Sequence, residues 1–308
     1  MSSLNTNIAA MTALQTLSST NREMLVTQNR VSTGLRVKDA SDNAAYWSIA
    51  TTMRSDNMAV STVADALGLG GATTDVAVTA MNNAIEAASK IKAKLVAARE
   101  PGLDRGKIQS EISALQTELQ STAESAVFSG ENWLNVDSTG PTVKTIVASF
   151  SRDSTGAISI GTIEVDVGAT GTMLFDTSGG GAGILDSDKT VTSGGTYTVA
   201  NLDITAITDD PADLQDLEDM ISGVDDALSA MTDAATVLGA AKSRISLQKE
   251  FVAKLMDTID TGIGQLVDAD MNEESTRLQA LQVRQQLGVQ ALGIANQSAQ
   301  QILKLFQG

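Results

Sequence analysis

The sequence contains no cysteine and no histidine among its 308 residues. Without cysteine there is no disulfide, no thiolate nucleophile and no cysteine-type zinc site, and without histidine there is no imidazole base and no histidine-ligated metal. Aromatic residues make up only 3%, so the apolar content is mostly aliphatic and suits helix seams better than a thick globular core. Because only carboxylates, lysine and hydroxyl groups remain for chemistry, we predict no enzymatic activity, no cofactor and no metal site.

Basic residues are also scarce, and the net charge is −16. Nucleic acids and anionic membranes bind through a basic footprint, so we expect neither as a partner. No apolar run approaches the length of about eighteen residues that predicts a membrane-spanning helix. The first residues lack the basic start and apolar block of a signal peptide. If the protein leaves the cell, we expect a route that reads no cleavable signal.

The chain has two helical arms and a different middle. Residues 1–135 and 211–308 are rich in Ala, Leu, Gln, Ser and Met, as in helices. Residues 136–210 hold 11 of the 25 glycines. Their charge is three basic against ten acidic residues, which predicts a small, solvated β domain.

Apolar and polar residues alternate along 142–147 and 158–167, which predicts two strands. The turn signal Ser154-Thr155-Gly156 between them predicts a hairpin. Composition predicts a loop at 178–183, and 197–207 could supply one or two more strands.

The C-terminal arm opens with Asp210 as a helix cap and Pro211 at the first helical position. Apolar residues then repeat in heptads, which predicts a coiled-coil seam. A stagger at Lys242 shifts the register, and Thr261–Gly264 predicts a break. The seam residues are Leu217, Ile221, Val224, Leu228, Met231, Ala235 and Leu238, followed by Ala241, Ile245, Gln248, Val252, Leu255 and Ile259.

Helices at the two ends of the chain share an unusual lack of charge. The last helix has no charged residue between Arg284 and Lys304, and its N-terminal counterpart has none before Arg22. We predict that the two helices are partners. The apolar seam is Leu4, Ile8, Met11, Leu14 and Leu17 at the N-terminus, and Leu278, Leu281, Gln285, Gly288, Leu292, Ala295, Ala299, Ile302 and Phe306 at the C-terminus.

Two explanations fit this pair. The helices could simply belong to an ordinary helical bundle. Pairing buries only one stripe of each helix, however, and does not explain why the remaining faces also lack charge. Self-association into a larger helical array does explain it, with ends that order when partners arrive.

Three motifs stand out in this sequence: Ser32-Thr33-Gly34-Leu35-Arg36 followed by Asp42-Asn43-Ala44-Ala45, then Phe128 to Asn135, and finally Asp268-Ala269-Asp270 followed by Ala295-Asn296-Gln297. They resemble motifs of bacterial flagellins. Residues 29–45 are similar to the N-terminal pattern Ser-x-Gly-x-Arg-Ile, Ala, Asp-Asp-Ala-Ala, and residues 128–135 to the short hairpin that closes the N-terminal half. Residues 268–303 are similar to the flagellin C-terminus. The motif residues are Ser32, Gly34, Arg36, Asp42, Ala44, Ala45, Ala295, Asn296 and Gln297.

The resemblance implies a mainly α fold with long coiled-coil helices from both arms and a variable β-rich insertion. It implies N-terminal and C-terminal filament-core helices at 1–40 and 265–308, a central helical domain at 41–135 with 211–264, and a solvent-facing domain at 136–210. The glycines of 67–71 are then expected inside a continuous, locally soft helix. Tyr46 and Trp47 are expected to be core or interface anchors.

The resemblance also implies a function. Flagellins are extracellular subunits that polymerise into the bacterial flagellar filament, and are exported unfolded without signal cleavage. The implied partners are other copies or sister flagellins, an export chaperone, the filament cap and hook-junction proteins. The immune-receptor segment of the family corresponds to Lys92, Lys94 and Glu111. At 92–96 the usual Arg-Glu-Leu-Ala-Val is replaced by Lys-Ala-Lys-Leu-Val, whereas the aligned Glu is kept as Glu111. This difference argues against recognition by the vertebrate flagellin receptor.

Two other readings stay open at this point. A hook–filament junction protein shares the terminal motifs, although the match at 128–135 favours the filament subunit. A secreted helical effector or adhesin would explain the heptads and the missing signal peptide, but not three flagellin motifs in order. A flagellin with an inserted zinc protease is excluded because the chain has no histidine.

Overall fold

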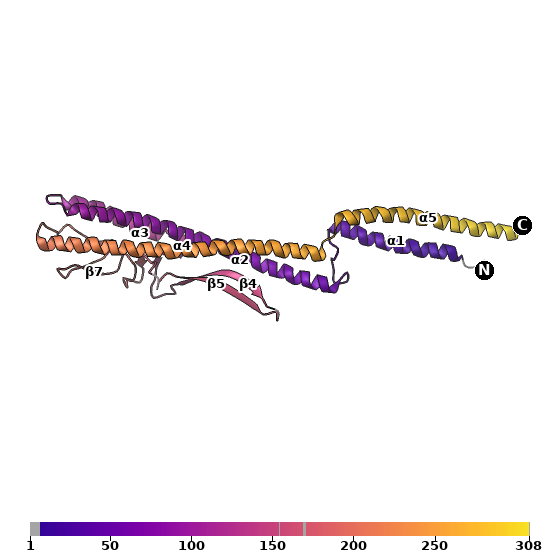
Figure 1. Cartoon of the computed structure of the whole chain (residues 1–308), viewed down its shortest axis with the longest axis horizontal. Helices are drawn as coiled ribbons and strands as arrows, with labels where there is room; N and C mark the ends of the chain where they lie inside the picture. Colours follow the sequence, from indigo (N-terminus) through magenta and orange to yellow (C-terminus); the bar gives the residue numbers. More distant parts are fainter. Residues whose placement is uncertain (1–6, 154, 169–170, 308) are drawn as a thin grey trace. The chain divides into compact units, whose positions relative to one another are not determined.

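The computed structural model describes residues 7–153, 155–168 and 171–307, without the side chains of 298–307. The chain forms two compact units: a terminal unit of residues 1–57 and 257–308, and a central unit of residues 58–256. The fold is mainly α-helical with a small β region in the middle of the sequence, as predicted (Figure 1). The helices are α1 (Ile8–Thr33), α2 (Ala44–Ala98), α3 (Arg105–Ser125), α4 (Pro211–Val267) and α5 (Met271–Gln307).

The terminal unit pairs α1 with α5 (Figure 1). Asn7 caps α1, because its Oδ1 accepts a hydrogen bond from Ala10 N at 3.0 Å. Gly34 ends the helix with a φ of 73°, and its N–H donates to Arg30 O at 2.8 Å. This left-handed backbone favours glycine because it has no Cβ to clash.

Three long helices of the central unit share one hydrophobic core. α2 continues unbroken through Gly68, Gly70 and Gly71, as expected. A methyl group at Gly70 would lie 2.6 Å from Ile146 Cδ1. The glycine is therefore explained by a close approach of the β region to the helix.

The buried seam of α4 differs from the predicted one. α4 begins at Pro211 as predicted, but the predicted residues Ile221, Leu228 and Ala235 are only partly buried. Met220, Ala227 and Ala234 take the inner positions. The heptad repeat then continues in one register past Lys242. The predicted stagger at Lys242 was therefore wrong. Its residues are Leu217, Met220, Val224, Ala227, Met231, Ala234, Leu238, Ala241, Ile245, Gln248 and Val252.

The predicted helix break at Thr261–Gly264 was also wrong, because α4 continues to Val267. A methyl group at Gly262 would lie 3.0 Å from Met53 Cε, so the glycine serves close packing. A single glycine costs only about 1 kcal/mol in a helix, which a helix of this length tolerates. The chain breaks instead before α5, where Asp270 Oδ1 accepts a hydrogen bond from Asn272 N at 2.8 Å.

Short strands make four two-stranded sheets. The predicted hairpin is present as an antiparallel pair with a bulge at Ala148. The expected hairpin of 128–135 is also present, with its turn at Ser129 and Gly130. In 197–207, where one or two strands were predicted, Tyr197 ends a short strand, a 3-10 helix η1 (Val199–Asn201) follows, and the remaining residues form no strand. The strands are β1 (Val127–Phe128), β2 (Glu131–Asn132), β3 (Asn135–Val136), β4 (Val143–Arg152), β5 (Ile158–Asp166), β6 (Phe175–Asp176), β7 (Lys189–Thr190) and β8 (Thr196–Tyr197).

The segment 136–210 packs its apolar residues into the helical core. Ile146, Leu174 and Ile204 are buried in the same cluster as the seam of α2 and α4. Gln109 on α3 fastens this segment, since its Nε2 donates to Leu202 O and its Oε1 accepts from Ile204 N, both at 3.0 Å. The segment is thus a layer on the helices (Figure 1).

Candidate assembly surface

The two terminal helices run antiparallel and are joined by polar contacts along their length. Asn7 Nδ2 donates to Ala295 O at 2.9 Å, and Gln285 Nε2 donates to Asn21 Oδ1 at 2.8 Å. Near the other end, Arg30 Nη1 lies 2.9 Å from Glu274 Oε1. The sequence prediction that these helices are partners is confirmed.

The protected stripe of α5 is the predicted one. Leu281 is buried, and Gln285 and Gly288 are half-buried between exposed neighbours. The remaining described members of the stripe, all half-buried, are Leu278, Leu292 and Ala295. The side chains of Ala299, Ile302 and Phe306 lie outside the described part of the chain.

Of the seam predicted for α1, Ile8, Met11 and Leu14 do not face α5, and their predicted place in the interface between subunits stays a prediction. Ile8, Met11 and Leu14 are 62%, 55% and 59% exposed. Leu17 does face α5, where a methyl group at Gly288 would lie 3.3 Å from Leu17 Cδ1. Small and polar residues let the helices approach closely, which leaves the larger residues outside. Leu4 lies outside the described residues. The stripe that is protected consists of Ala10, Ala13, Leu17, Thr20, Met24, Thr27 and Val31.

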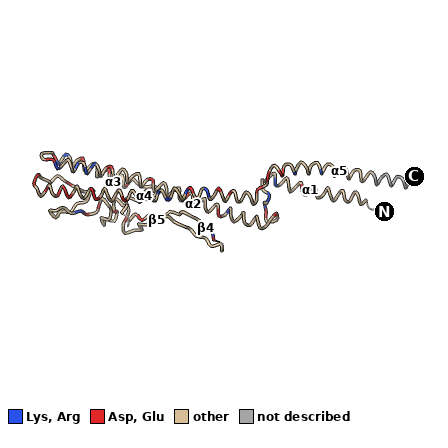
Figure 2. The backbone as a smooth tube through the Cα atoms, viewed as in Figure 1, with Lys and Arg blue, Asp and Glu red and all other residues tan. Residues whose placement is uncertain are grey.

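In the terminal unit, large apolar side chains are therefore more numerous on the surface than in the interior. Among its described residues, 13 large apolar side chains are exposed and five apolar residues are buried. An excess of large exposed apolar side chains is typical of an interaction surface. Charge is also sparse on these helices (Figure 2). The exposed residues are Ile8, Met11, Leu14, Leu25, Val26, Tyr46, Trp47, Ile49, Met271, Val283, Leu287, Val289 and Ile294.

Motif residues of the N-terminal segment build a junction with the end of α4. Arg36 N and Val37 N donate to Val267 O at 2.7 and 3.2 Å, and Ala269 N donates to Gly34 O at 2.9 Å. The Arg36 guanidinium donates to Leu266 O at 3.1 Å and Gln265 O at 3.3 Å. A cation at the carbonyl end of a helix is favoured by the helix dipole.

The same junction sets the start of α2. Asp42 Oδ2 accepts hydrogen bonds from Lys38 N at 3.0 Å and Asp39 N at 3.3 Å. These bonds, that from Lys38 first, hold the pKa of Asp42 below its usual value. The amide of Asn43 caps the helix that begins at Ala44 and Ala45, accepting from Ala45 N at 3.1 Å. The other motif residues Ser32, Asn296 and Gln297 lie exposed on the terminal helices.

Comparison with known proteins decides the family. Residues 4–139 match the bacterial flagellin N-terminal helical region and residues 221–306 the bacterial flagellin C-terminal helical region. The chain belongs to the bacterial flagellin family. It is 50% identical to Flagellin C and 44% identical to Flagellin A of Rhizobium meliloti (strain 1021), with 100% of each chain covered. It is 46% identical to a flagellin of Brucella melitensis biotype 1, again over 100% of both chains.

Membership of the flagellin family gives the function in outline. Flagellins are non-enzymatic structural subunits of the bacterial flagellar filament, outside the cell and serving motility. Full-length relatives that are themselves flagellins favour the filament subunit over the hook-junction and effector readings. In the described part of the chain, none of the helices is apolar over enough length to span a bilayer.

Tyr46 and Trp47 of this flagellin do not belong to its core. Their side chains are 41% and 37% exposed at the start of α2. Of the two roles predicted from the sequence, core packing is therefore wrong. The interface role stays a prediction.

Lys92, Lys94 and Glu111, which the resemblance assigned to an immune-receptor segment, form ion pairs within the central unit. Lys92 Nζ lies 2.5 Å from Asp225 Oδ1, which joins α2 to α4. Lys94 forms an ion pair with Glu111 on α3. The structure thus brings Lys94 and Glu111 together, and each of these two charges has its partner within the same chain.

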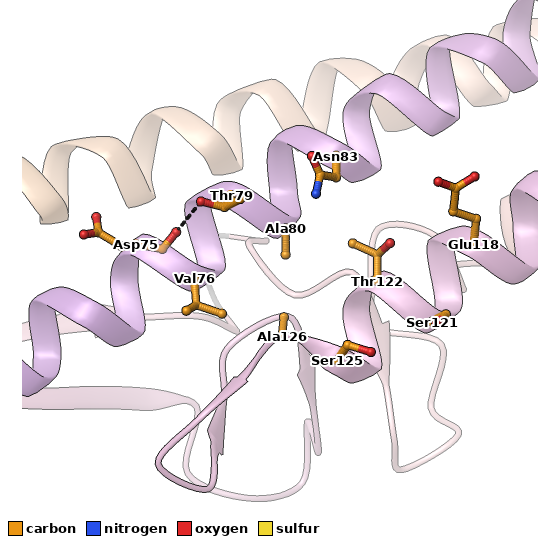
Figure 3. A pocket seen from close by; sticks show the side chains of 10 residues that line it. All are labelled: Asp75, Val76, Thr79, Ala80, Asn83, Glu118, Ser121, Thr122, Ser125 and Ala126. Atoms are coloured by element: carbon orange, nitrogen blue, oxygen red, sulfur yellow. Dashed lines mark hydrogen bonds between the residues drawn. The ribbon is translucent and has the colours of Figure 1, made fainter.

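A groove between α2 and α3 shows what this surface offers for chemistry (Figure 3). Its volume is about 510 Å³, and its lining is mostly small, uncharged side chains. Its two carboxylates, Asp75 and Glu118, lie at opposite ends (Figure 3). Asp75 is paired with Lys242 at 2.7 Å. The groove is therefore suited to packing.

Proposed function

We propose that α1 and α5 form the filament core and that their outer apolar faces pack against the terminal helices of neighbouring subunits. One observation supports this most strongly: the terminal unit exposes 13 large apolar side chains and buries only five apolar residues among those described. Contact with neighbours would remove this surface from water, at about 25 cal/mol per Å². Flagellins polymerise into a filament, so membership of this family implies that such neighbouring subunits exist.

The finer assignments belong to the same proposal. The core helices correspond to 1–40 and 265–308, and the layer at 136–210 faces solvent, in agreement with its acidic composition. The partners are further copies of the chain and sister flagellins, with an export chaperone, the filament cap and hook-junction proteins during export and assembly. Export proceeds without a cleavable signal.

Leu287 provides a direct test because it is 59% exposed on the outer face of α5. Leu287→Glu should leave the monomer fold unchanged, since exposed substitutions usually shift stability by about 0.5 kcal/mol or less. It should abolish seeded polymerisation, because a charge without a partner in a packed helix array costs several kcal/mol. Pelleting assays and electron microscopy measure this directly.

Leu287→Met is the matched control. It keeps the volume and the apolar character, a change that usually costs less than about 1.5 kcal/mol in a packed site. We expect filaments from this variant. Normal filaments from Leu287→Glu would contradict the proposed assembly surface.

A further inference from the structure

Arginine is distributed unevenly over the terminal helices. α1 and α5 contain only four arginines, and all four line one groove of about 670 Å³ between these two helices. Arg22 and Arg30 come from α1, and Arg277 and Arg284 from α5. A chain with a net charge of −16 has thus gathered positive charge at one place on its least charged helices.

At the inner end of the groove, where Arg30 and Arg277 lie, the positive charge is neutralised by a carboxylate of the same chain. Glu274 is buried, with a side chain only 7% exposed. Its Oε1 lies 2.9 Å from Arg30 Nη1 and 3.7 Å from Arg277 Nη1. This carboxylate offsets the charge of the inner arginines and fixes the helices at this end.

The outer half of the groove is not neutralised in this way. Arg22 and Arg284 are exposed, and neither makes an ion pair or hydrogen bond with any described residue. Both residues line the same groove, which Arg22 borders from α1 and Arg284 from α5. Glu23 is the one acidic residue among those that line the groove. Like charges that line one groove without a carboxylate partner raise the local positive potential and favour an anion there.

Planar guanidinium forks bind carboxylates with two parallel hydrogen bonds. Arg22 and Arg284 are the two guanidinium groups of the groove that no described carboxylate pairs with, so the groove offers these two to a partner surface. Val26, 48% exposed, lies in the same lining and continues the apolar face of α1. A protein surface with carboxylates matches this combination better than a small free anion does.

We propose that this arginine groove binds carboxylate side chains of a second copy of the chain, with Arg22 and Arg284 as the intermolecular pair. The inference rests on the proposed assembly function. The charge complementarity lies within the protein, which has 37 acidic against 21 basic residues. In the filament the groove would fix the register of neighbouring subunits, a role that non-directional apolar contacts fulfil poorly.

Charge reversal tests the proposal. Arg22→Glu/Arg284→Glu should raise the protein concentration needed for seeded assembly by about tenfold or more, since hydrogen bonds to charged groups contribute at that level. Arg244→Glu, an exposed reversal on α4, is the matched control and should assemble like wild type. Circular dichroism checks that each monomer is helical. Should the reversal disturb folding, Arg22→Gln/Arg284→Gln takes its place and should give a smaller increase in the concentration needed for assembly.

Crosslinking identifies the occupant. Arg22→Lys/Arg284→Lys keeps the charge and introduces amines that carbodiimide couples to nearby carboxylates. In filaments from mixed ¹⁵N-labelled and unlabelled protein, we expect crosslinked peptides that join a heavy chain to a light one. Crosslinks within single chains only would overturn the proposal. Wild-type assembly that needs phosphate and fails in chloride of equal ionic strength would also overturn it, by showing a free anion instead.

The assembly function and the role of the arginine groove can be contradicted separately. If wild type does not polymerise, the proposed function is wrong. If wild type and Arg244→Glu polymerise, and the double reversal polymerises equally well, only the role of the arginine groove is wrong.

Discussion

At the scale of single residues, two glycines of α2 meet opposite surroundings. A methyl group at Gly70 would lie 2.6 Å from both Cδ1 and Cγ2 of the buried Ile146, whereas one at Gly68 meets nothing within 4 Å. Sequence alone assigns both the same helix penalty. Only the packed structure shows that Gly70 makes room for strand β4.

This difference predicts effects of opposite sign. Gly70→Ala should destabilise the protein by about 1–3 kcal/mol, the usual cost of overpacking, even after the gain in helix propensity. Gly68→Ala should stabilise it by up to about 1 kcal/mol. Urea unfolding followed by circular dichroism measures both. Equal effects from the two variants would show that Ile146 can move aside.

The sequence revealed one group of functional residues, the junction motif, and missed another, the arginine groove. The junction motif around Gly34 and Arg36 was found by resemblance to a family, and the structure gives it a hydrogen-bonding role. The arginine groove was missed, because Arg22 and Arg284 are far apart in the sequence and each looks like an ordinary surface charge. Only the antiparallel pairing of α1 with α5 brings them together.

At the scale of helices, periodicity located the helices well but chose the wrong face twice. In α1 the large apolar residues were taken as the inner seam, yet Ile8 and Leu14 point outward and Thr20 and Thr27 are buried. In α4 Ile221, Leu228 and Ala235 were chosen in place of Met220, Ala227 and Ala234. In α1 small and polar residues such as Ala13 and Thr20 lie at the contact, and hydrophobicity alone does not select them. In α4 the two possible seams lie one residue apart and are both apolar, so hydrophobicity alone does not choose between them.

The inner position of α4 can be tested with two alanines. Ala234 is fully buried, whereas Ala253 is exposed on the same helix. Ala234→Glu should lower the free energy of unfolding by several kcal/mol, because it forces an unpaired carboxylate into the core. Ala253→Glu should change it by about 0.5 kcal/mol or less. Thermal melts of the two variants settle the register, and a tolerated Ala234→Glu would restore the predicted seam.

At the scale of the whole molecule, the segment 136–210 shows the limit of composition. Glycine content and acidity correctly indicated a β region at the surface, and alternation located β4 and β5. The sequence suggested a domain of its own, but buried residues such as Leu174, Leu202 and Ile204 join the helical core. Such sharing has no local signal, since the partners of these residues lie on helices distant in sequence.

Carboxylates hold the turns of this layer, and they set how the protein responds to acid. Hydrogen bonds from the side chain and then the backbone of Thr192 lower the pKa of Asp219 on α4. Hydrogen bonds from Ser138 and Ser178 lower the pKa of Asp176 strongly. A lowered pKa in the folded state contributes stability above the unfolded value of 3.8, and this stability is lost as pH falls through the folded value.

The stability of the central unit should therefore be flat between about pH 5 and pH 8, since the chain has no histidine to titrate there. It should decline below about pH 4, where the carboxylates begin to take up protons that the folded state resists. Urea unfolding at a series of pH values measures the curve. Asp176→Asn should flatten the acid decline, because the amide cannot titrate and part of the linkage disappears. A fall in stability between pH 7 and pH 5 would mean that some other group, outside these turns, dominates the linkage.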